Sequence, residues 1–368
     1  MKNLSKITLL AALVLTLLNT SCSKDNIKPE YHYENIYDLV VNTVSSENIP
    51  GMIAAIIDSS GVLQIESAGV RKIGSPEQIT DNDHFHIGSC GKAMTSAMIA
   101  TLVAEDKIKW QTSLIEVFPE LEDSIHYDYH NITLHQLLTH RAGIADTGPD
   151  YILYENLNIV GRRYLNMIHV LKEPNQINAG DFHYSNVGYV IAGIMAERIT
   201  GQSWETLMKN HIFEPLGMSS AGFGPPGTIS QIDQPWGHNK SNGEWQPSQL
   251  DNIEEIGPAG TIHCSIEDWA KFISIYLKQN NTAILERRLI EKLIEPVGKY
   301  ACGWVVEYQD RAGGLVLAHN GSNSIWYAGI WVAPELNRAF IAGTNSFDDN
   351  TEGIIQAAIN NLIKIYQE

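Results

Sequence analysis

Cysteine is scarce in this sequence, and its spacing excludes two common uses of that residue. The 368 residues include 4 cysteines, and once Cys22 near the N-terminus is set aside, Cys90, Cys264 and Cys302 remain. No Cys-x-x-Cys pair is present, and the remaining number is odd. The sequence therefore predicts neither a disulfide framework nor a zinc site built on cysteine pairs, and buried free thiols are expected instead.

Positive charge is also in short supply. The chain has 25 Lys and Arg residues against 42 Asp and Glu residues, which gives a formal net charge of -17 that is spread along its length. Nucleic-acid binding is not expected, because phosphate contacts need a basic face. The apolar fraction of 44% and the charged fraction of 18% are those of an ordinary globular protein.

The apolar run at the N-terminus is too short to span a bilayer. It extends from Ile7 to Leu18, follows two lysines and precedes small polar residues that end at Cys22. This pattern is typical of an export signal. The cysteine resembles the acylated residue of a bacterial lipoprotein, although Asn19 stands where that pattern prefers leucine. We therefore expect a lipoprotein-type signal peptide at 1–21 and a lipid on Cys22.

Residues 22–33 would then be a tether. The expected location is a bacterial cell envelope, on the periplasmic side or the cell surface, with the N-terminal lipid as the only contact with the membrane. Simple secretion is the alternative.

Candidate strands lie at both ends of the remaining chain. "GMIAAIIDSSGVLQIESAGV" predicts two strands joined by a turn at 59–61, and "GGLVLAHNG", "WYAGIWVAP" and "RAFIAGTNS" predict three more. Helical patterns occur near 35–44 and at 351–366, and the middle of the chain is mostly helical. The expected fold is α+β, with an antiparallel sheet built from both chain ends, flanking helices and a mostly helical inserted region. One domain would span 34–368.

The segment "HFHIGSCGKAMTSAMIA" starts a helix with a serine and places a lysine one turn later. Ser89 could be a simple N-cap. However, a capping box needs Glu or Gln at position 92, and the helix dipole favours an acid there, whereas the residue is Lys92. The (i, i+3) spacing puts hydroxyl and amine on one helix face, where the dipole and partial burial would lower the pKa of the lysine. Ser89 is therefore a candidate nucleophile with Lys92 as its partner.

Seven stretches in a fixed order carry a resemblance to a known family. They are "FHIGSCGKAMTSAMIATLVAEDKI", "ITLHQLLTHRAGI", "FHYSNVGYVIAGIMAERITG", "IFEPLGMSSAGF", "GPAGTIHCSIEDWAKFI", "CGWVV" and "LAHNGSNSIWYAGIWV". The chain, from about Ile49 to Ser346, resembles the serine beta-lactamase and penicillin-binding-protein family, in the branch of class C beta-lactamases, D-Ala-D-Ala carboxypeptidases, D-aminopeptidases and related esterases. The resemblance implies a beta-lactamase/transpeptidase-like fold and acyl transfer without a metal or organic cofactor.

The family order selects Tyr184, Ser185 and Asn186 among several Tyr-x-Asn triplets. In the family this tyrosine shuttles the nucleophile's proton with the lysine, and the asparagine holds the lysine and the substrate carbonyl. A phenol beside an ammonium ion would also have its phenolate favoured, so Tyr184 could act as a base. Without the resemblance, we would interpret Tyr184 as a core tyrosine with a satisfied hydroxyl.

His319-Asn320-Gly321 stands where the family has Lys-Thr-Gly. Gly321 would let substrate lie close to the backbone, and the N–H of Ser322 could join that of Ser89 in an oxyanion hole. His319 could donate a hydrogen bond or, when protonated, bind a carboxylate, but it lacks the permanent charge of lysine. Histidine also occurs here among carboxypeptidases and D-aminopeptidases of the branch. The similar triplet His86-Ile87-Gly88 precedes the serine and falls outside the family order.

Other catalytic schemes lack their motifs. Ser89 is not in a Gly-x-Ser-x-Gly elbow, no His-Glu-x-x-His predicts a metal site, and Cys90 has no base beside it. The sequence therefore predicts a serine hydrolase that forms an acyl-enzyme with a peptide, amide or ester, foremost a D-amino-acid-containing cell-wall-type peptide or a small ester. A beta-lactamase and a non-catalytic penicillin- or peptidoglycan-binding lipoprotein are the alternatives, because a fold does not determine specificity.

Overall fold

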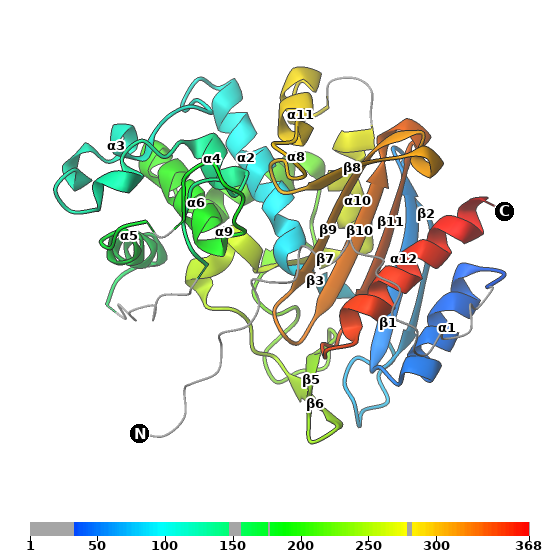
Figure 1. Cartoon of the computed structure of the whole chain (residues 1–368). Coiled ribbons are helices and arrows are strands. Elements are labelled where there is room, and N and C mark those ends of the chain that lie inside the picture. Colours follow the sequence, from blue (N-terminus) through cyan, green and yellow to red (C-terminus); the bar gives the residue numbers. More distant parts are fainter. Residues whose placement is uncertain (1–32, 147–155, 176, 278–281, 368) are drawn as a thin grey trace.

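Strands from both ends of the chain form one antiparallel sheet, as the sequence predicts. The computed structural model describes residues 33–146, 156–175, 177–277 and 282–367, so the predicted signal peptide, Cys22 and nearly all of the tether lie outside the described residues. The sheet has six strands in the order β2-β1-β11-β10-β9-β8 (Figure 1). Their bounds are β1 Gly51–Asp58, β2 Gly61–Gly69, β8 Val305–Gln309, β9 Gly314–Ser322, β10 Tyr327–Ala333 and β11 Arg338–Thr344.

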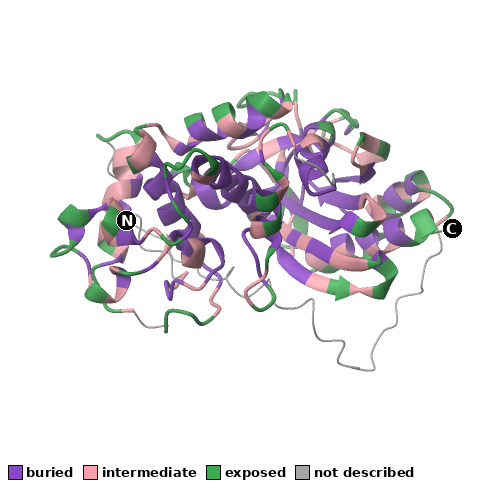
Figure 2. Ribbon diagram, turned by 90° about the horizontal axis from the view of Figure 1, so that it is seen from above, coloured by how far each residue is buried: buried purple, intermediate pink, exposed green. Residues whose placement is uncertain are grey.

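The sheet is covered by helices on both faces, which explains why β1 is apolar at every position from 52 to 57. On β1, Ile53, Ala55 and Ile57 belong to the core shared with α2 and α10, whereas the residues between them belong to the core shared with α1 and α12. Buried residues occur both in the sheet and in the helical region beside it (Figure 2).

The helical segments lie mainly between the N-terminal and the C-terminal strands. The α-helices are α1 Ile36–Glu47, α2 Lys92–Ala104, α3 Leu114–Val117, α4 Leu134–Leu138, α5 Ile159–Val170, α6 Asn186–Thr200, α7 Trp204–Met208, α8 Glu214–Leu216, α9 Gly257–Gly260, α10 Ile266–Leu277, α11 Arg287–Ile294 and α12 Thr351–Gln367. Shorter turns of other helical type are η2 Gly88–Gly91, η3 Pro119–Leu121, η4 Tyr127–Tyr129, η5 Lys209–Phe213, η6 Glu254–Ile256, η7 Asp310–Ala312 and η8 Pro334–Leu336.

Several short strands were not predicted from the sequence. Besides β8, they form a small sheet in the order β3-β7-β4 and the hairpin β5-β6. A segment of two to five residues is too short to display a clear alternation of apolar and polar positions. Their bounds are β3 His84–His86, β4 Gly222–Phe223, β5 Gly237–Ser241, β6 Glu244–Ser248 and β7 Ile262–Ser265.

The three remaining cysteines are buried free thiols, as expected. Burial raises the pKa of Cys90 above its usual value, so this thiol is held in its unreactive protonated form. Among the described residues, no helix has the length and apolar character to cross a membrane. In the same part of the chain, no cluster of His, Cys, Asp or Glu side chains is arranged to hold a metal ion.

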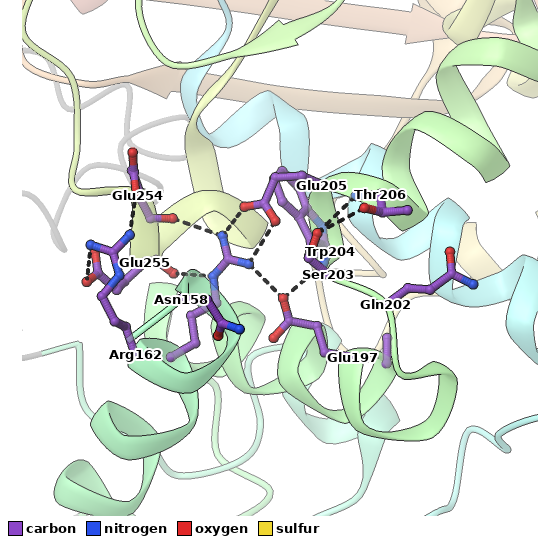
Figure 3. A network of polar contacts seen from close by, with 12 residues as sticks. Asn158, Arg162, Glu197, Gln202, Ser203, Trp204, Glu205, Thr206, Glu254 and Glu255 are labelled. Carbon is purple, nitrogen blue, oxygen red and sulfur yellow. Dashed lines mark hydrogen bonds and ion pairs between the residues drawn. The ribbon is translucent and has the colours of Figure 1, made fainter. Parts of the chain in front are cut away.

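A buried arginine joins the helices around the middle of the chain. Arg163 of α5 is fully buried and donates to Glu197 of α6, to Glu205 of α7 and to the backbone carbonyls of Glu254 and Glu255 in η6. Figure 3 labels these four glutamates in the network. Because α9 follows η6 directly, this network holds the segment that carries α9. The carbonyl oxygens of α9 lie against α2, and one of them belongs to the site described next.

Candidate active site

Ser89 lies in the tight turn η2 between β3 and α2, and not in the first turn of the α-helix as expected. The N-cap positions of η2 and α2 are Ile87 and Gly91, and neither has a capping side chain, so the capping interpretation of Ser89 is wrong. In a turn with three residues per revolution, positions i and i+3 eclipse each other. The Ser89 hydroxyl and the Lys92 amine are therefore aligned, and Nζ donates to Oγ at 2.9 Å.

Close backbone packing places the end of β9 against this turn. Gly88 has φ of +50°, and a Cβ on it would lie 2.3 Å from the backbone nitrogen of Ser322. A Cβ on Gly321 would lie 2.1 Å from the carbonyl oxygen of Ile87 and 2.5 Å from the backbone nitrogen of Ser89. The missing side chain of Gly321 therefore allows the turn that carries Ser89 to pack directly against β9. The sequence interpretation had expected substrate to occupy this space. The backbone nitrogens of Ser89 and Ser322 consequently border the same small region.

Lys92 is completely buried at the first position of α2. Its ammonium group donates to Ser89 Oγ, to Asn186 Oδ1 at 2.7 Å and to the carbonyl oxygen of Ala259 at 2.7 Å. Burial lowers the pKa of Lys92 to about 7, and the charge of Asp146 opposes the decrease. The expected decrease is therefore present, but full burial is its main cause, whereas the sequence interpretation invoked partial burial and the helix dipole. At neutral pH a substantial fraction of the amine can accept a proton.

Tyr184 lies beside the lysine, with Lys92 Nζ 4.9 Å from its ring centroid. Its hydroxyl is buried and has no hydrogen-bond partner among the described residues. Burial raises the pKa of Tyr184 above its usual value, and the neighbouring Ser89 hydroxyl only partly opposes this rise. The expectation that the ammonium ion favours a phenolate is therefore contradicted. Tyr184 rests as a protonated phenol, which can donate or relay a proton.

Asn186 links the lysine to a carboxylate that the sequence analysis missed. Asn186 starts α6, its Oδ1 accepts from Lys92, and its Nδ2 donates to Asp146 Oδ2 at 3.0 Å. Its backbone N–H donates to Asp146 Oδ1 at 2.7 Å. Asp146 thus fixes the amide with its oxygen toward the amine, and burial raises the pKa of this carboxyl. Asp146 follows the "THRAGI" stretch by two residues, but no spacing rule connects it to Asn186.

His319 does not offer the charge that the sequence analysis considered. Its side chain is buried, Nδ1 lies 2.6 Å from the carbonyl oxygen of Asn320, and Nε2 lies 3.0 Å from the hydroxyl of Tyr300. Because a carbonyl oxygen only accepts, Nδ1 carries the proton and Nε2 accepts from Tyr300. Burial lowers the pKa of His319 to about 3, and the nearby Lys92 lowers it further. The ring is neutral at physiological pH, so a cationic carboxylate-binding role is contradicted.

His140, which the sequence analysis did not single out, supports the turn that carries the tyrosine. Its ring is buried 4.2 Å, centroid to centroid, from that of Tyr184, and Nδ1 accepts from the backbone N–H of Ser185 at 3.0 Å. A positive φ of 57° turns the backbone at this residue. His140 and Tyr300 come from separate loops, so only the folded chain identifies them as part of the site.

The model of the family described as Beta-lactamase matches residues 36–363. The chain belongs to the beta-lactamase family. This family includes beta-lactamases and penicillin-binding proteins, as the resemblance implies, and the chain spans about three fifths of the length of the first curated relative that it matches. The six-stranded sheet with its helical insertion is the corresponding α+β fold.

Individual relatives of this beta-lactamase-family chain are distant. It is 25% identical over 340 residues to Unguisins hydrolase ungD' of Aspergillus campestris, and this match covers 85% of this chain and 61% of that protein. It is 25% identical over 273 residues to a Beta-lactamase of Escherichia coli, covering 74% of this chain and 67% of that protein. The structure of an octameric penicillin-binding protein homologue from Pyrococcus abyssi has a TM-score of 0.70 at 23% identity, covering 88% of this chain and 76% of that one.

Proposed function

We propose that this chain hydrolyses D-amino-acid-containing peptides or amides, or small esters, through an acyl-enzyme on Ser89. The observation that carries the proposal is the hydrogen bond of 2.9 Å from Lys92 Nζ to Ser89 Oγ, in a pocket where burial brings the lysine pKa to about 7. An amine of this pKa can act as a general base at neutral pH, and an adjacent general base activates a serine as a nucleophile.

The proposed reaction uses the neutral form of Lys92 as the base. The amine takes the proton of Ser89 as Oγ bonds to the substrate carbonyl carbon, and the backbone N–H groups of Ser89 and Ser322 stabilise the resulting oxyanion. The protonated amine and the Tyr184 phenol then deliver a proton to the leaving group as its bond to carbon breaks. Water attacks the ester, and the same groups return the proton to Ser89 when the acid leaves.

The neutral state of His319 favours a substrate that does not need a carboxylate for recognition. Recognition of a carboxylate in a partly buried site is strongest when a fixed cation meets it. His319 accepts from Tyr300 and is buried, so it supplies no such charge near neutral pH. We therefore favour D-amino-acid amides and small esters over beta-lactams and over peptides that end in a free D-amino acid.

A substrate panel tests this proposal. We would compare kcat/KM for D-amino-acid amides, p-nitrophenyl esters, a D-Ala-D-Ala peptide and nitrocefin, with Ser89→Ala as the control for background hydrolysis. The expected result is the highest kcat/KM on an amide or ester and covalent labelling of Ser89 by a fluorophosphonate. Higher kcat/KM on nitrocefin or the D-Ala-D-Ala peptide would overturn the substrate preference, and labelling that persists in Ser89→Ala would overturn the nucleophile.

We also propose that the protein is exported and acylated at Cys22. The support is the sequence of 1–21 alone, with its two lysines, its short apolar run and the cysteine after it. Expression in bacteria with labelled palmitate should label the wild type and not Cys22→Ser. Equal labelling of both, or a mature N-terminus elsewhere by mass spectrometry, would contradict the proposal.

A further inference from the structure

The histidine three residues before Ser89 takes part in a buried polar chain that the proposed reaction does not use. Gly88 N–H donates to His86 Nδ1 at 3.2 Å, so Nδ1 is unprotonated and the ring proton is on Nε2. Nε2 donates to the carboxylate of Asp251, 3.0 Å from Oδ1 and 3.2 Å from Oδ2. The side chains of His86 and Asp251 are 0% and 6% exposed, so this pair is shielded from water.

Asp251 continues the chain to the other side of the nucleophile. Its Oδ1 accepts from Asn323 Nδ2 at 2.8 Å, and Asn323 directly follows Ser322. The side-chain oxygen Oδ1 of Asn323 accepts in turn from the backbone N–H of Trp326 at 3.1 Å, which fixes the turn after β9. One carboxylate therefore connects the segment before Ser89 with the segment after Ser322.

A neighbouring residue connects the same loop to the lysine. Asn252 donates its backbone N–H to Asp251 at 2.7 Å and its Nδ2 to the carbonyl oxygen of Gly260 at 3.0 Å. Gly260 follows Ala259, whose carbonyl oxygen accepts from Lys92. The loop at 251–252 thus contacts all three backbone segments around Ser89, although none of its side chains bonds to the reacting groups themselves.

We propose that Asp251 and His86 are positioning residues that set the two backbone N–H groups of Ser89 and Ser322 at the separation an oxyanion requires. The proposal rests on the proposed function, because it assumes an oxyanion formed at Ser89. The bond from Gly88 N–H to His86 fixes the Ile87–Gly88 peptide, one residue before the peptide that carries the Ser89 N–H, in a turn where Gly88 has a positive φ. Asn323 fixes the strand end that carries Ser322 in the same way.

The test separates positioning of the oxyanion hole from general stability. Asp251→Asn places an amide opposite the Asn323 amide, which weakens this contact. We expect kcat on the best ester of the panel to fall about 10- to 100-fold with KM within about twofold, because donors aimed at the oxyanion act in the transition state. The dissociation constant of a phenylboronic acid, whose boron becomes tetrahedral when Ser89 Oγ adds to it, should rise by a similar factor.

Three further variants complete the experiment. Asp251→Asn with Asn323→Asp restores a donor–acceptor pair of reversed direction and should recover at least about tenfold in kcat. His86→Leu removes the acceptor for Gly88 and should reproduce the loss if Asp251→Asn does not fold. Asp233→Asn removes an exposed carboxylate that bonds to Thr228, and it should leave kcat unchanged.

The outcomes distinguish this inference from the proposed function. Unchanged kcat and boronate affinity in Asp251→Asn and His86→Leu would overturn the positioning role. A fall in kcat without loss of boronate affinity would also overturn it, since that pattern indicates a structural effect. Failure of the wild type to form any Ser89 adduct would instead refute the proposed acyl-enzyme.

Discussion

At the residue scale, burial lowers the pKa of Lys92 and raises the pKa of Tyr184, and in both cases it favours the uncharged form. Removal from water disfavours the ammonium form of Lys92 and the phenolate form of Tyr184. Near neutral pH, Tyr184 is therefore a neutral phenol, and a substantial fraction of Lys92 is a neutral amine. In the proposed reaction, these charge states suit Lys92 as the base that receives the Ser89 proton and Tyr184 as a proton donor or relay.

The pH dependence of acylation should report on Lys92. Its pKa of about 7 predicts that kcat/KM rises with pH through this value and falls about tenfold per unit below it, because only the neutral amine accepts the proton. Stopped-flow acylation rates on a neutral ester would measure the profile. Lys92→Arg should be inactive at every pH, since arginine stays protonated. An acylation rate independent of pH between about 5.5 and 8.5 would exclude Lys92 as the base.

Replacement of the buried phenol tests the role of Tyr184. Tyr184→Phe should lower kcat about 100-fold, as the loss of a proton-transfer group does, with little loss of stability because the hydroxyl has no partner among the described residues. Tyr164→Phe is the matched control at another Tyr-x-Asn triplet, and its hydroxyl donates to Glu120. Equal losses from the two substitutions would remove the basis for choosing Tyr184.

Because His319 is neutral, we expect the recognition of a substrate carboxylate to be independent of pH near neutrality. Since its pKa is about 3, the ratio of kcat/KM for a carboxylate-bearing peptide to that for a neutral ester should stay flat from about pH 5.5 to about pH 8.5. Steady-state assays across this range, corrected for spontaneous ester hydrolysis, measure the ratio. A ratio that declines through about pH 6.5 would show that His319 carries charge when substrate binds.

At the element scale, the helix α5 supplies no side chain to the candidate site, but it fixes the positions of elements that do. Arg163 of α5 makes five hydrogen bonds that reach α6, α7 and η6, and α9 after η6 presents the Ala259 carbonyl to Lys92. Asn186 at the start of α6 binds the same amine. The lysine environment therefore depends on how these short elements are packed around one guanidinium.

Removal of this guanidinium should be costly. Arg163→Met leaves Glu197 buried without its partner, and loss of one member of a buried ion pair lowers the free energy of unfolding by about 3–5 kcal/mol. Arg198→Gln removes a half-exposed partner of Glu120 and should cost less than about 1 kcal/mol. Urea unfolding followed by circular dichroism compares the two. Similar costs would show that the Arg163 network adds little to stability.

At the scale of the whole molecule, the sheet closes the two ends of the chain on each other. β11 lies between β1 and β10, with Ala342 opposite Ala54 in one neighbour and Gly329 in the other. α1 and α12 cover one face together, although they are at opposite ends of the sequence. The turn that carries Ser89 and the end of β9 can meet only after this closure.

Deletion of 338–368 should abolish folding. The truncated chain would lose β11 and α12, expose the facing edges of β1 and β10, and leave the core shared with α1 uncovered. Thermal denaturation should show no cooperative transition, and a fluorophosphonate should not label Ser89. Deletion of 367–368 alone is the control and should preserve both. A cooperative transition in the longer deletion would show that β11 is dispensable.

The sequence by itself determined the elements with clear periodicity and the residues recognised by motif order. The strands β1, β2, β9, β10 and β11, the terminal helices, and the set of Ser89, Lys92, Tyr184 and Asn186 were all predicted, and the structure brings these four side chains together. The patterns of the strands, of the terminal helices and of Ser89 with Lys92 are local, since each depends on neighbours within one element or one helical turn, so they can be read without the fold. Tyr184 and Asn186 were instead selected by the order of the motifs that carry the family resemblance.

The tertiary structure alone decided the charge states and the supporting contacts. The neutral His319, the protonated Tyr184 and the acceptors of Lys92 follow from burial and from partners distant in sequence, such as Tyr300, Asp146 and Ala259. The short strands and the contact between His86 and Asp251 also correspond to no periodic pattern in the sequence. A pKa and a hydrogen bond depend on the surrounding atoms, and in this protein those atoms come from segments that only folding brings into contact.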